Sequence, residues 1–401
     1  MVEAELDVLR TVIALTVLVL VGRILGTVFS RFRMPEVIGE VSAGIVLGPL
    51  ALGGIIILFD KPLVELNDLM LAFAQIGAII ILFSAGLEYT FRDLRKAGLP
   101  ASIVGTAGVV LPMFGGYYVS ILFGYEWTVA MLIGATLTAT SIAITVRILQ
   151  ELNRQKSVEG NVLVNAALID DVLGLTVLSL ATSIVVAGTL PSITELALVT
   201  GQSLAIWFAL LLASVLFLPR LVHGITMLRA KGTIEVVSTT SAFGVAAAAG
   251  SLGLSPIVGA FAAGMGLAGS RPVQEIREFM RQLKILFGPL FFAIIGTYFD
   301  PRQLLQLDIT FFVVLLAVAI LTKILGCGLP ATFLLKSRDK GFKVGYGMVS
   351  RGEVGFIIAG IGLASGIFAQ GVYSALVLVI MVTTIISPIL LRHAYSKSKE
   401  E

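Results

Sequence analysis

The hydrophobic residues of this 401-residue chain fall into long continuous runs, and short polar segments separate them. A run of about 20 apolar residues can cross the hydrocarbon core of a bilayer as a helix, and about 13 such runs are present. They cover residues 8–30, 36–58, 66–88, 100–123, 127–150, 160–187, 192–219, 233–253, 256–270, 284–299, 308–335, 343–366 and 370–391. The pattern therefore predicts an all-α polytopic membrane protein.

The composition favours the same class and narrows the chemistry. Hydrophobic residues make up 57% of the chain and charged residues 13%, whereas a soluble domain carries roughly 25% charged residues. Because Cys327 is the only cysteine, no disulfide can form within the chain. The net charge of +3 gives no sign of a nucleic-acid partner. We expect membrane lipid around the chain, and no cofactor.

Lysine and arginine residues are unevenly divided between the two sides of the predicted bilayer. Most of the 28 basic residues lie in alternate connections between the apolar runs. The opposite connections hold only Lys61 and Arg302, with Arg10 close to the N-terminus. Basic connections stay on the cytoplasmic side. The distribution therefore predicts a multi-pass protein of the cell membrane with its N-terminus outside and its C-terminus in the cytoplasm.

Short motifs in the first half of the chain recur in the second half. The aligned pairs are Gly44 in PEVIGEVSAG with Gly264 in PIVGAFAAG, Gly86 with Gly296, and TATSIA at 138–143 with MVSRGE at 348–353. An odd number of predicted spans separates the two copies, so they would cross the membrane in opposite directions. Such inverted-topology repeats are typical of secondary transporters. The alternative is that the shared glycines serve helix packing alone.

The fifth and twelfth runs contain polar residues for which a continuous lipid-facing helix has no use. The fifth includes Thr140 and Ser141, and the twelfth includes Arg351 and Glu353. Unwound backbone is tolerated at membrane depth only where it is buried in protein or lines a cavity. The pattern thus predicts two discontinuous helices that cross, with Arg351 and Glu353 neutralising the partial charges of the helix ends. Alternatively, the hydroxyl groups of the threonine and serine residues in the fifth run hydrogen-bond to the backbone carbonyl four residues earlier in the same helix.

Two adjacent carboxylates, Asp170 and Asp171, interrupt the apolar stretch AALIDDVLGLTVLSL at 166–180. An aspartate at the centre of a bilayer costs about 2.5–3.5 kcal/mol, so a pair of them requires a function. A buried carboxylate that holds either a proton or a monovalent cation, but never both, is a minimal exchanger. Burial favours the neutral acid, which allows the protonated and the ionised form to coexist near neutral pH.

We expect Asp171 to be this shared site, with Asp170 beside it as a second Na+ ligand. Thr140, Ser141 and carbonyl groups of the fifth run would complete the shell of oxygens around the cation. Neighbouring helix positions differ by about 100°. One aspartate can therefore face the cation while the other pairs with Lys323, and the sequence leaves open which one does so. The alternative is a static buried salt bridge, which leaves the second acid unexplained.

With these residues in place, the chain resembles the monovalent cation–proton antiporter family (CPA2), in the NapA-like branch of sodium/proton antiporters related to NhaA. The matching motifs are PEVIGEVSAGIVLGP at 35–49, FSAGLE at 83–88, TATSIAITVRILQEL at 138–152, ALIDDVLGL at 167–175, LSPIVGAFAAGM at 254–265 and SRGEVGF at 350–356. The most specific elements of the family are the Asp-Asp pair and a lysine in the eleventh run, and this chain has both.

The resemblance implies an NhaA-like fold, a homodimer and two parts with different roles. A mobile transport core would comprise residues of about 100–187 and 308–395, and a scaffold for dimerisation would comprise about 1–99 and 188–307. Moving the core against the scaffold would expose a buried site to one side of the membrane at a time, in an elevator-like mechanism.

The predicted function is secondary active exchange of Na+ or Li+ for H+, which is electrogenic if Lys323 also releases a proton. K+/H+ exchange is the main alternative, since the sequence does not set the distances that distinguish these cations. An ion channel is more distant, because its filter is usually assembled from repeated subunits. An intramembrane aspartyl protease needs aspartates on separate helices and a Gly-x-Gly-Asp motif, which the sequence lacks. We therefore expect no enzymatic activity.

Overall fold

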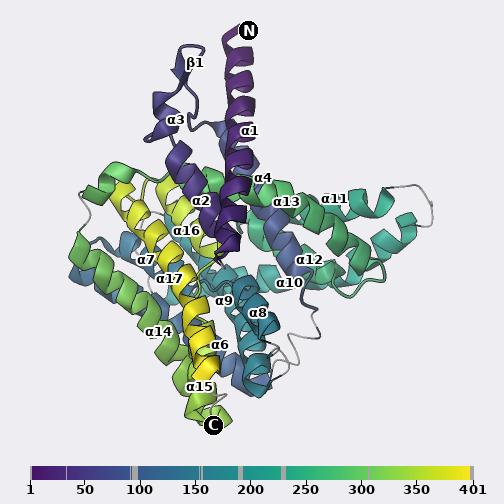
Figure 1. Ribbon diagram of the computed structural model, residues 1–401. Coiled ribbons are helices and arrows are strands. Elements are labelled where there is room, and N and C mark those ends of the chain that lie inside the picture. Colours follow the sequence, from purple (N-terminus) through teal and green to yellow (C-terminus); the bar gives the residue numbers. More distant parts are fainter. Residues whose placement is uncertain are drawn as a thin grey trace. The chain divides into compact units, whose positions relative to one another are not determined.

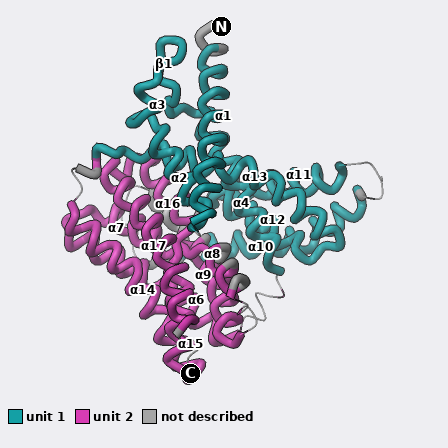
Figure 2. The backbone as a smooth tube through the Cα atoms, in the orientation of Figure 1, with its two compact units in different colours: residues 1–91, 191–302 teal, residues 92–190, 303–401 magenta. Residues whose placement is uncertain are grey.

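The chain divides into two compact units, shown in two colours in Figure 2. Unit 1 comprises Met1–Phe91 and Pro191–Arg302, and unit 2 comprises Arg92–Leu190 and Gln303–Glu401. Each unit therefore combines a segment from the first half of the chain with one from the second half. The computed structural model describes residues 2–32, 34–90, 92, 98–152, 154, 157–187, 193–226, 232–305 and 308–397.

In its described residues, unit 1 is helical apart from one short hairpin, which lies beside the N-terminal part of the first helix (Figure 1). Its elements are α1 Val2–Arg31, α2 Glu36–Leu47, α3 Leu52–Ile55, β1 Ile57–Leu58, β2 Lys61–Pro62, α4 Asp68–Gly86, α10 Ile193–Thr226, α11 Thr233–Ser251, α12 Pro256–Leu267 and α13 Val273–Thr297. The two strands pair antiparallel, with Ile57 opposite Pro62.

The described part of unit 2 consists of helices, and in two places one helix follows another across a short non-helical break. Its helices are α6 Gly98–Leu122, α7 Trp127–Thr138, α8 Ile142–Glu151, α9 Val158–Ala187, α14 Ile309–Leu335, α15 Arg338–Gly347, α16 Glu353–Ala364 and α17 Gln370–Lys397. A 3-10 turn, Pro301–Leu305, lies where the chain passes from unit 1 to unit 2.

Several helices have the length and composition of membrane spans. Among the described residues, eight helices are long and apolar enough to cross a membrane. Three shorter apolar helices, Trp127–Thr138, Pro256–Leu267 and Val354–Ala364, accompany them. Side chains cap some of the starts: Asn67 accepts a hydrogen bond from the Met70 backbone N–H at 3.0 Å, and such a bond satisfies one of the donors that begin a helix without a partner.

The second apolar run, 36–58, is predicted as one span but does not form one continuous helix. α2 ends at Leu47, and Gly48 has extended backbone angles. Pro49 follows it and has no N–H to continue the helical hydrogen bonds. The chain then forms α3 and the hairpin. The hydrophobicity of the sequence does not reveal this interruption, because the residues after Pro49 are again apolar.

The tenth run, 284–299, is longer in the structure than in the prediction, since α13 begins at Val273. The added turns are amphipathic, with Ile276 and Met280 buried. Arg277 lies between them and donates from Nη2 to the Leu87 carbonyl at 2.6 Å, just past the end of α4. Charged residues on the other positions lower the average hydrophobicity of these turns, so a search for apolar runs misses them.

Helices in unit 1 cross at glycines, where the two backbones touch. A Cβ atom on Gly44 of α2 would lie 2.8 Å from the Cα of Gly296 in α13. A Cβ atom on Gly264 of α12 would lie 2.9 Å from the Cα of Gly86 in α4. Such close crossings exclude any larger residue and are common between membrane helices. In the sequence repeat, Gly44 is aligned with Gly264 and Gly86 with Gly296. Each crossing therefore joins one glycine from each aligned pair.

Unit 2 contains two further crossings of this kind, each between consecutive helices. A Cβ atom on Gly116 of α6 would lie 2.9 Å from the Cα of Gly134 in α7. A Cβ atom on Gly345 of α15 would lie 3.2 Å from the Cα of Gly328 in α14. These contacts pack each broken helix against the helix that precedes it, and so position the non-helical breaks.

Candidate ion-binding site

The two non-helical breaks of unit 2 contact each other directly. Residues 139–141 separate α7 from α8, and residues 348–352 separate α15 from α16. The Ser141 backbone N–H donates to the Ser350 carbonyl at 3.0 Å, and Ser350 Oγ donates to the Ser141 carbonyl at 3.1 Å. Each break thereby satisfies polar backbone groups that the other leaves without an intrahelical partner.

Some hydroxyl groups near the breaks bond within their own helix, and others are available for contacts at the breaks, as the two sequence-based interpretations expect. Thr136 Oγ1 donates to the Leu132 carbonyl of its own helix at 2.8 Å, four residues earlier. Thr145 Oγ1 lies 3.4 Å from the Ser141 carbonyl, four residues earlier, but its shorter hydrogen bond, 2.6 Å, goes to the carbonyl of Gly347, the last residue of α15 before the other break. Thr140 is buried, and its Oγ1 has no hydrogen-bond partner among the described residues. An unpaired buried oxygen of this kind can serve as a ligand to a cation.

A buried ion pair joins α9 to α14. Lys323 Nζ donates to Asp170 Oδ1 at 2.6 Å, and both side chains are 0% exposed. The structure thus pairs Asp170 with the lysine, and the side chain of Asp171 is not among those described. Asp170 Oδ2 has no hydrogen-bond partner in the described part of the chain. A buried charged pair is stable only when its partners remain together.

Arg351 brings a second positive charge to the same region. It belongs to the break between α15 and α16, and its side chain is completely buried. Its Nη2 donates to the Ala319 carbonyl at 2.7 Å, one turn before Lys323 on α14. Its Nε and Nη1 have no partner among the described residues. The sequence assigns Arg351 to the helix ends, and in the structure its side chain reaches α14 one turn before Lys323.

Two of the predicted site residues lie outside the described side chains. Asp171 follows Asp170 within α9, and Glu353 begins α16. Their backbone positions are given by these helices, but their side chains are not among those described. The predicted roles of Asp171 as the shared cation and proton site, and of Glu353 as a compensating charge, remain predictions.

Other residues at this site were not singled out from the sequence. Cys327 is buried next to the ion pair. It follows Lys323 by four positions, so a helical reading of α14 places both on one face. Thr384 Oγ1 of α17 donates to the Arg351 carbonyl at 2.8 Å. No sequence signal links residues of α17 to the break, because that contact depends on tertiary packing.

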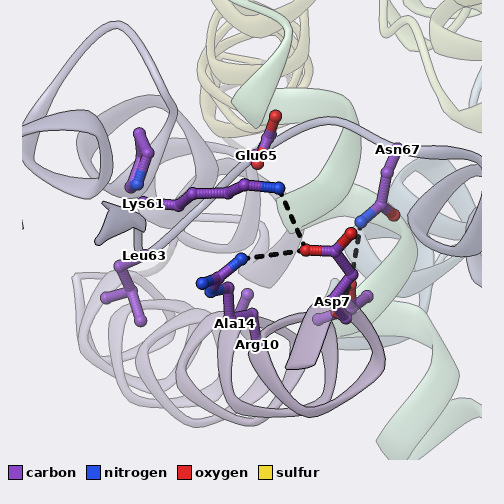
Figure 3. A pocket seen from close by; sticks show the side chains of 9 residues that line it. Asp7, Arg10, Ala14, Lys61, Leu63, Glu65 and Asn67 are labelled. Carbon is purple, nitrogen blue, oxygen red and sulfur yellow. Dashed lines mark hydrogen bonds and ion pairs between the residues drawn. The ribbon is translucent and has the colours of Figure 1, made fainter. Parts of the chain in front are cut away.

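A second polar cluster lies in unit 1, where a cavity of about 150 Å³ lies between α1 and the chain from β2 to Asn67 (Figure 3). Asp7 Oδ1 accepts from Arg10 Nη1 at 2.9 Å and from Lys61 Nζ at 3.1 Å. Arg10 Nη2 donates to the Phe59 carbonyl in the hairpin. These groups bond to one another and hold the hairpin against α1. We therefore interpret this cluster as structural and not as a transport site.

Comparison with known proteins agrees with this architecture. The family model "Sodium/hydrogen exchanger, transmembrane" matches residues 11–395. The chain is 31% identical over 384 residues to the Na(+)/H(+)-K(+) antiporter GerN of Bacillus cereus, covering 95% of each chain. It is 32% identical over 387 residues to a Na(+)/H(+) antiporter of Enterococcus hirae, covering 96% of this chain and 98% of the relative.

A solved structure shares the fold. The sodium proton antiporter MjNhaP1 from Methanocaldococcus jannaschii matches with a TM-score of 0.73 at 15% identity, over 96% of this chain and 97% of that one. The predicted class of a polytopic helical membrane protein is confirmed. Together, the matched family and the shared fold show that this chain belongs to the sodium/hydrogen exchanger family and is a multi-pass membrane transporter, not an enzyme.

Proposed function

We propose that this protein exchanges Na+ or Li+ for H+ across the cell membrane. The observation that carries the proposal is the buried Asp170–Lys323 ion pair, in the same unit as two helix breaks that contact each other. Charged groups inside a membrane segment are costly and are typically kept for ion and proton pathways. The antiporters of Bacillus cereus and Enterococcus hirae named above support the same function.

Asp171 is the proposed site that the cation and the proton share. It adjoins Asp170 in α9, and Asp170 already accepts a hydrogen bond from Lys323. Thr140 and Ser141 are buried in the first break, where Thr140 Oγ1 supplies an oxygen with no partner in the described residues. Because one carboxylate cannot hold a proton and a cation together, each ion that binds must displace the other, and transport becomes exchange.

Lys323 makes the proposed exchange electrogenic. When the site is loaded with protons, Asp171 is neutral, and Asp170 and Lys323 cancel each other's charge. When Na+ binds, Asp171 is ionised and Lys323 has released its proton, so that two protons leave for each Na+ that enters. Each cycle then moves one charge, which couples transport to the membrane potential by about 2.3 kcal/mol per 100 mV.

The proposed mechanism is alternating access, in which a mobile core moves against a scaffold. The proposed mobile core, residues of about 100–187 and 308–395, falls inside unit 2, and the proposed scaffold supplies unit 1. The glycine crossings at aligned repeat positions support inverted-topology repeats, and the contacts between Ser141 and Ser350 support two crossed discontinuous helices. Inverted repeats provide two arrangements of similar energy. The proposed assembly is a homodimer in lipid, with the N-terminus outside and the C-terminus in the cytoplasm.

Purified protein in liposomes containing a pH-sensitive dye tests the function. Addition of Na+ or Li+ outside acidified liposomes should alkalinise the interior, and choline should not. K+/H+ exchange is the second candidate, because the Bacillus cereus relative is named a Na(+)/H(+)-K(+) antiporter. A response to K+ alone would replace the sodium proposal by the potassium one. The absence of a response to all three cations, from folded and correctly inserted protein, would contradict both.

A further inference from the structure

The C-terminal helix, α17, is bonded to the second break of unit 2 and to the end of α15 by hydroxyl groups on one of its faces. Thr384 Oγ1 donates to the Arg351 carbonyl at 2.8 Å, and Ser387 Oγ donates to the Tyr346 carbonyl at 2.9 Å. Both hydroxyl-bearing side chains are buried. Positions three apart lie on the same face of a helix, so α17 presents the two hydroxyl groups to α15 and the break together.

The Arg351 carbonyl depends on this contact for its hydrogen bond. It lies in the break between α15 and α16, where the helical pattern of hydrogen bonds is interrupted. In the described part of the chain, the Thr384 hydroxyl bonds to this carbonyl and no backbone N–H does so. The Tyr346 carbonyl, by contrast, also accepts from the Val349 N–H at 3.3 Å. Because a buried carbonyl group needs a partner, loss of the Thr384 hydroxyl disturbs the break more than loss of the Ser387 hydroxyl.

Arg351 is thereby fixed at two points. Its backbone is bonded to Thr384 of α17, and its buried side chain donates from Nη2 to the Ala319 carbonyl of α14 at 2.7 Å. Lys323 lies one turn further along α14, and its Nζ donates to Asp170. The hydroxyl of Thr384 therefore sets where the backbone of Arg351 lies relative to the helix that carries the lysine of the ion pair.

The same contact reaches the first break through the neighbouring residue. Ser350 precedes Arg351, and its carbonyl accepts from the Ser141 backbone N–H at 3.0 Å. Ser350 Oγ donates back to the Ser141 carbonyl at 3.1 Å. Since peptide groups are planar and adjacent ones share a Cα atom, a displacement of the Arg351 carbonyl also moves Ser350. Ser141 and the adjacent Thr140 are ligands in the proposed cation site, so their positions depend on the contact with α17.

We infer that Thr384, assisted by Ser387, is a positioning residue for cation binding. It is not itself a ligand, and it acts by holding the second break in the position from which Ser350 bonds to the first. The inference rests on the proposed function, in which the first break supplies oxygen ligands to Na+ or Li+. Loss of the Thr384 hydroxyl therefore weakens the apparent affinity for the cation, beyond any loss of stability.

Thr383→Val is the matched control for Thr384→Val. The two threonines are neighbours on α17, and both are buried. Thr383 Oγ1 donates to the Val379 carbonyl at 2.8 Å and to the Ile380 carbonyl at 3.0 Å, both within its own helix. Each valine variant therefore removes one hydroxyl group from the same part of the protein, and only Thr384→Val removes a bond to the break. Thr384→Ser keeps the hydroxyl group, and Ser387→Ala removes the second one.

Two measurements are made on each variant. The first is hydrogen–deuterium exchange of backbone amides in detergent, which reports local opening and requires no transport. Peptides that cover residues 136–145 and 344–356 contain the two breaks. The second is the Na+ concentration that gives half-maximal proton flux in liposomes, recorded together with the maximal flux. A general loss of stability lowers the amount of active protein and hence the maximal flux, but it leaves the half-maximal concentration unchanged.

We expect deuterium uptake of Thr384→Val to be about tenfold faster in both peptides, the order of effect of one lost buried hydrogen bond. The half-maximal Na+ concentration should rise by roughly 3- to 30-fold, as for other residues that act on a site through packed elements. Ser387→Ala should give smaller changes in the same direction. Thr383→Val and Thr384→Ser should match wild type in both measurements.

Three results would overturn the inference. They are equal values for the two valine variants, a Thr384→Ser variant that behaves like Thr384→Val, and faster deuterium uptake without a change in the half-maximal Na+ concentration. If Thr384→Val does not fold, Ser387→Ala decides: faster uptake in residues 344–356 with a higher half-maximal concentration supports the inference, and wild-type values overturn it. The inference and the proposed function fail separately. Wild-type protein without Na+-dependent flux contradicts the proposed function, whereas deuterium uptake still shows whether α17 holds the break.

Discussion

Ser141 and Ser350 are 209 residues apart in the sequence and hydrogen-bond to each other in both directions. The Ser141 backbone N–H donates to the Ser350 carbonyl at 3.0 Å, and Ser350 Oγ donates to the Ser141 carbonyl at 3.1 Å. A buried backbone group that loses its partner costs about 1–3 kcal/mol. Neither break can therefore shift alone, and the two broken helices behave as one element.

Thr145 provides a direct test of this link between the breaks. Thr145→Val removes the hydrogen bond from Oγ1 to the Gly347 carbonyl, which is 2.6 Å long. Because it leaves that carbonyl without this donor, we expect the free energy of unfolding to fall by about 1–3 kcal/mol. Thermal unfolding in detergent measures the loss, and the rate of exchange in liposomes should fall with it.

Thr136→Val is the control for this substitution. Thr136 Oγ1 donates to the Leu132 carbonyl, an acceptor within its own helix, and this carbonyl lies in α7, where the backbone N–H of residue 136 also bonds to it. Its replacement should change the free energy of unfolding by less than about 1 kcal/mol. Equal losses from the two variants would show that the hydroxyl of Thr145 contributes nothing specific to the contact between the breaks.

Asp171→Asn tests the proposed shared site. Asparagine has nearly the same shape as aspartic acid but can neither ionise nor release a proton. We expect Na+-dependent proton flux to fall to the level of liposomes without protein, while size-exclusion chromatography shows the same oligomer as for wild type. Asp68→Asn, at the exposed start of α4, should retain exchange. Wild-type flux from Asp171→Asn would mean that the shared carboxylate is another residue.

Lys323→Gln tests the origin of the transported charge. Removing one partner of a buried ion pair costs about 3–5 kcal/mol while the other partner stays charged, so the variant should be less stable than wild type. Any remaining exchange should be electroneutral, because only the proton of Asp171 then competes with the cation. Proton flux is measured with and without a potassium–valinomycin potential, using another permeant ion if K+ is transported.

The outcome for Lys323→Gln has a clear alternative. A variant that remains active and responds to voltage as the wild type does would show that the second proton is carried by another group. An inactive but folded variant agrees with the proposed role of the lysine and can be examined further through the pH dependence of its unfolding.

A disulfide within unit 1 tests whether this unit is a rigid scaffold. A Cβ atom on Gly22 of α1 would lie 3.7 Å from the Cβ of Ala293 in α13, which matches the separation of about 3.8 Å found in disulfides. In a Cys327→Ala background, oxidised Gly22→Cys with Ala293→Cys should keep full exchange and unfold at a higher temperature. Reversible loss of exchange on oxidation would mean that α1 and α13 must move against each other during transport.

The main parts of the candidate site are predictable because they violate the rules for apolar segments. Asp170 and Lys323 are charges within long hydrophobic runs, and buried charges require partners. The choice between Asp170 and Asp171 as the partner of Lys323 was not predictable. It depends on the rotation of α9 about its axis, which close packing with α6 sets: a Cβ atom on Gly105 would lie 2.6 Å from the Ala166 carbonyl.

Other features leave no signal in a single sequence. Gly108 is one small residue among many in an apolar helix, and only the fold shows that a Cβ atom there would lie 2.7 Å from Cys327 Sγ and 3.2 Å from Asp170 Oδ1. The contact between Thr145 and Gly347 joins residues 202 positions apart, so it cannot be read from local patterns. The end of α2 was missed for the opposite reason, since Gly48 and Pro49 are visible in the sequence but are surrounded by apolar residues.

The glycine crossings of unit 1 also set an order for the assembly of the protein during its synthesis. Gly44 on α2 meets Gly296 on α13, about 250 residues later in the chain. At about 5–20 residues per second, α2 is in the membrane for roughly 10–50 s before its partner helix is made. During this time Gly44 has no α13 backbone to pack against. Unit 1 is therefore completed only after most of the chain has left the ribosome, whereas α6 and α7 can pair as soon as both are inserted.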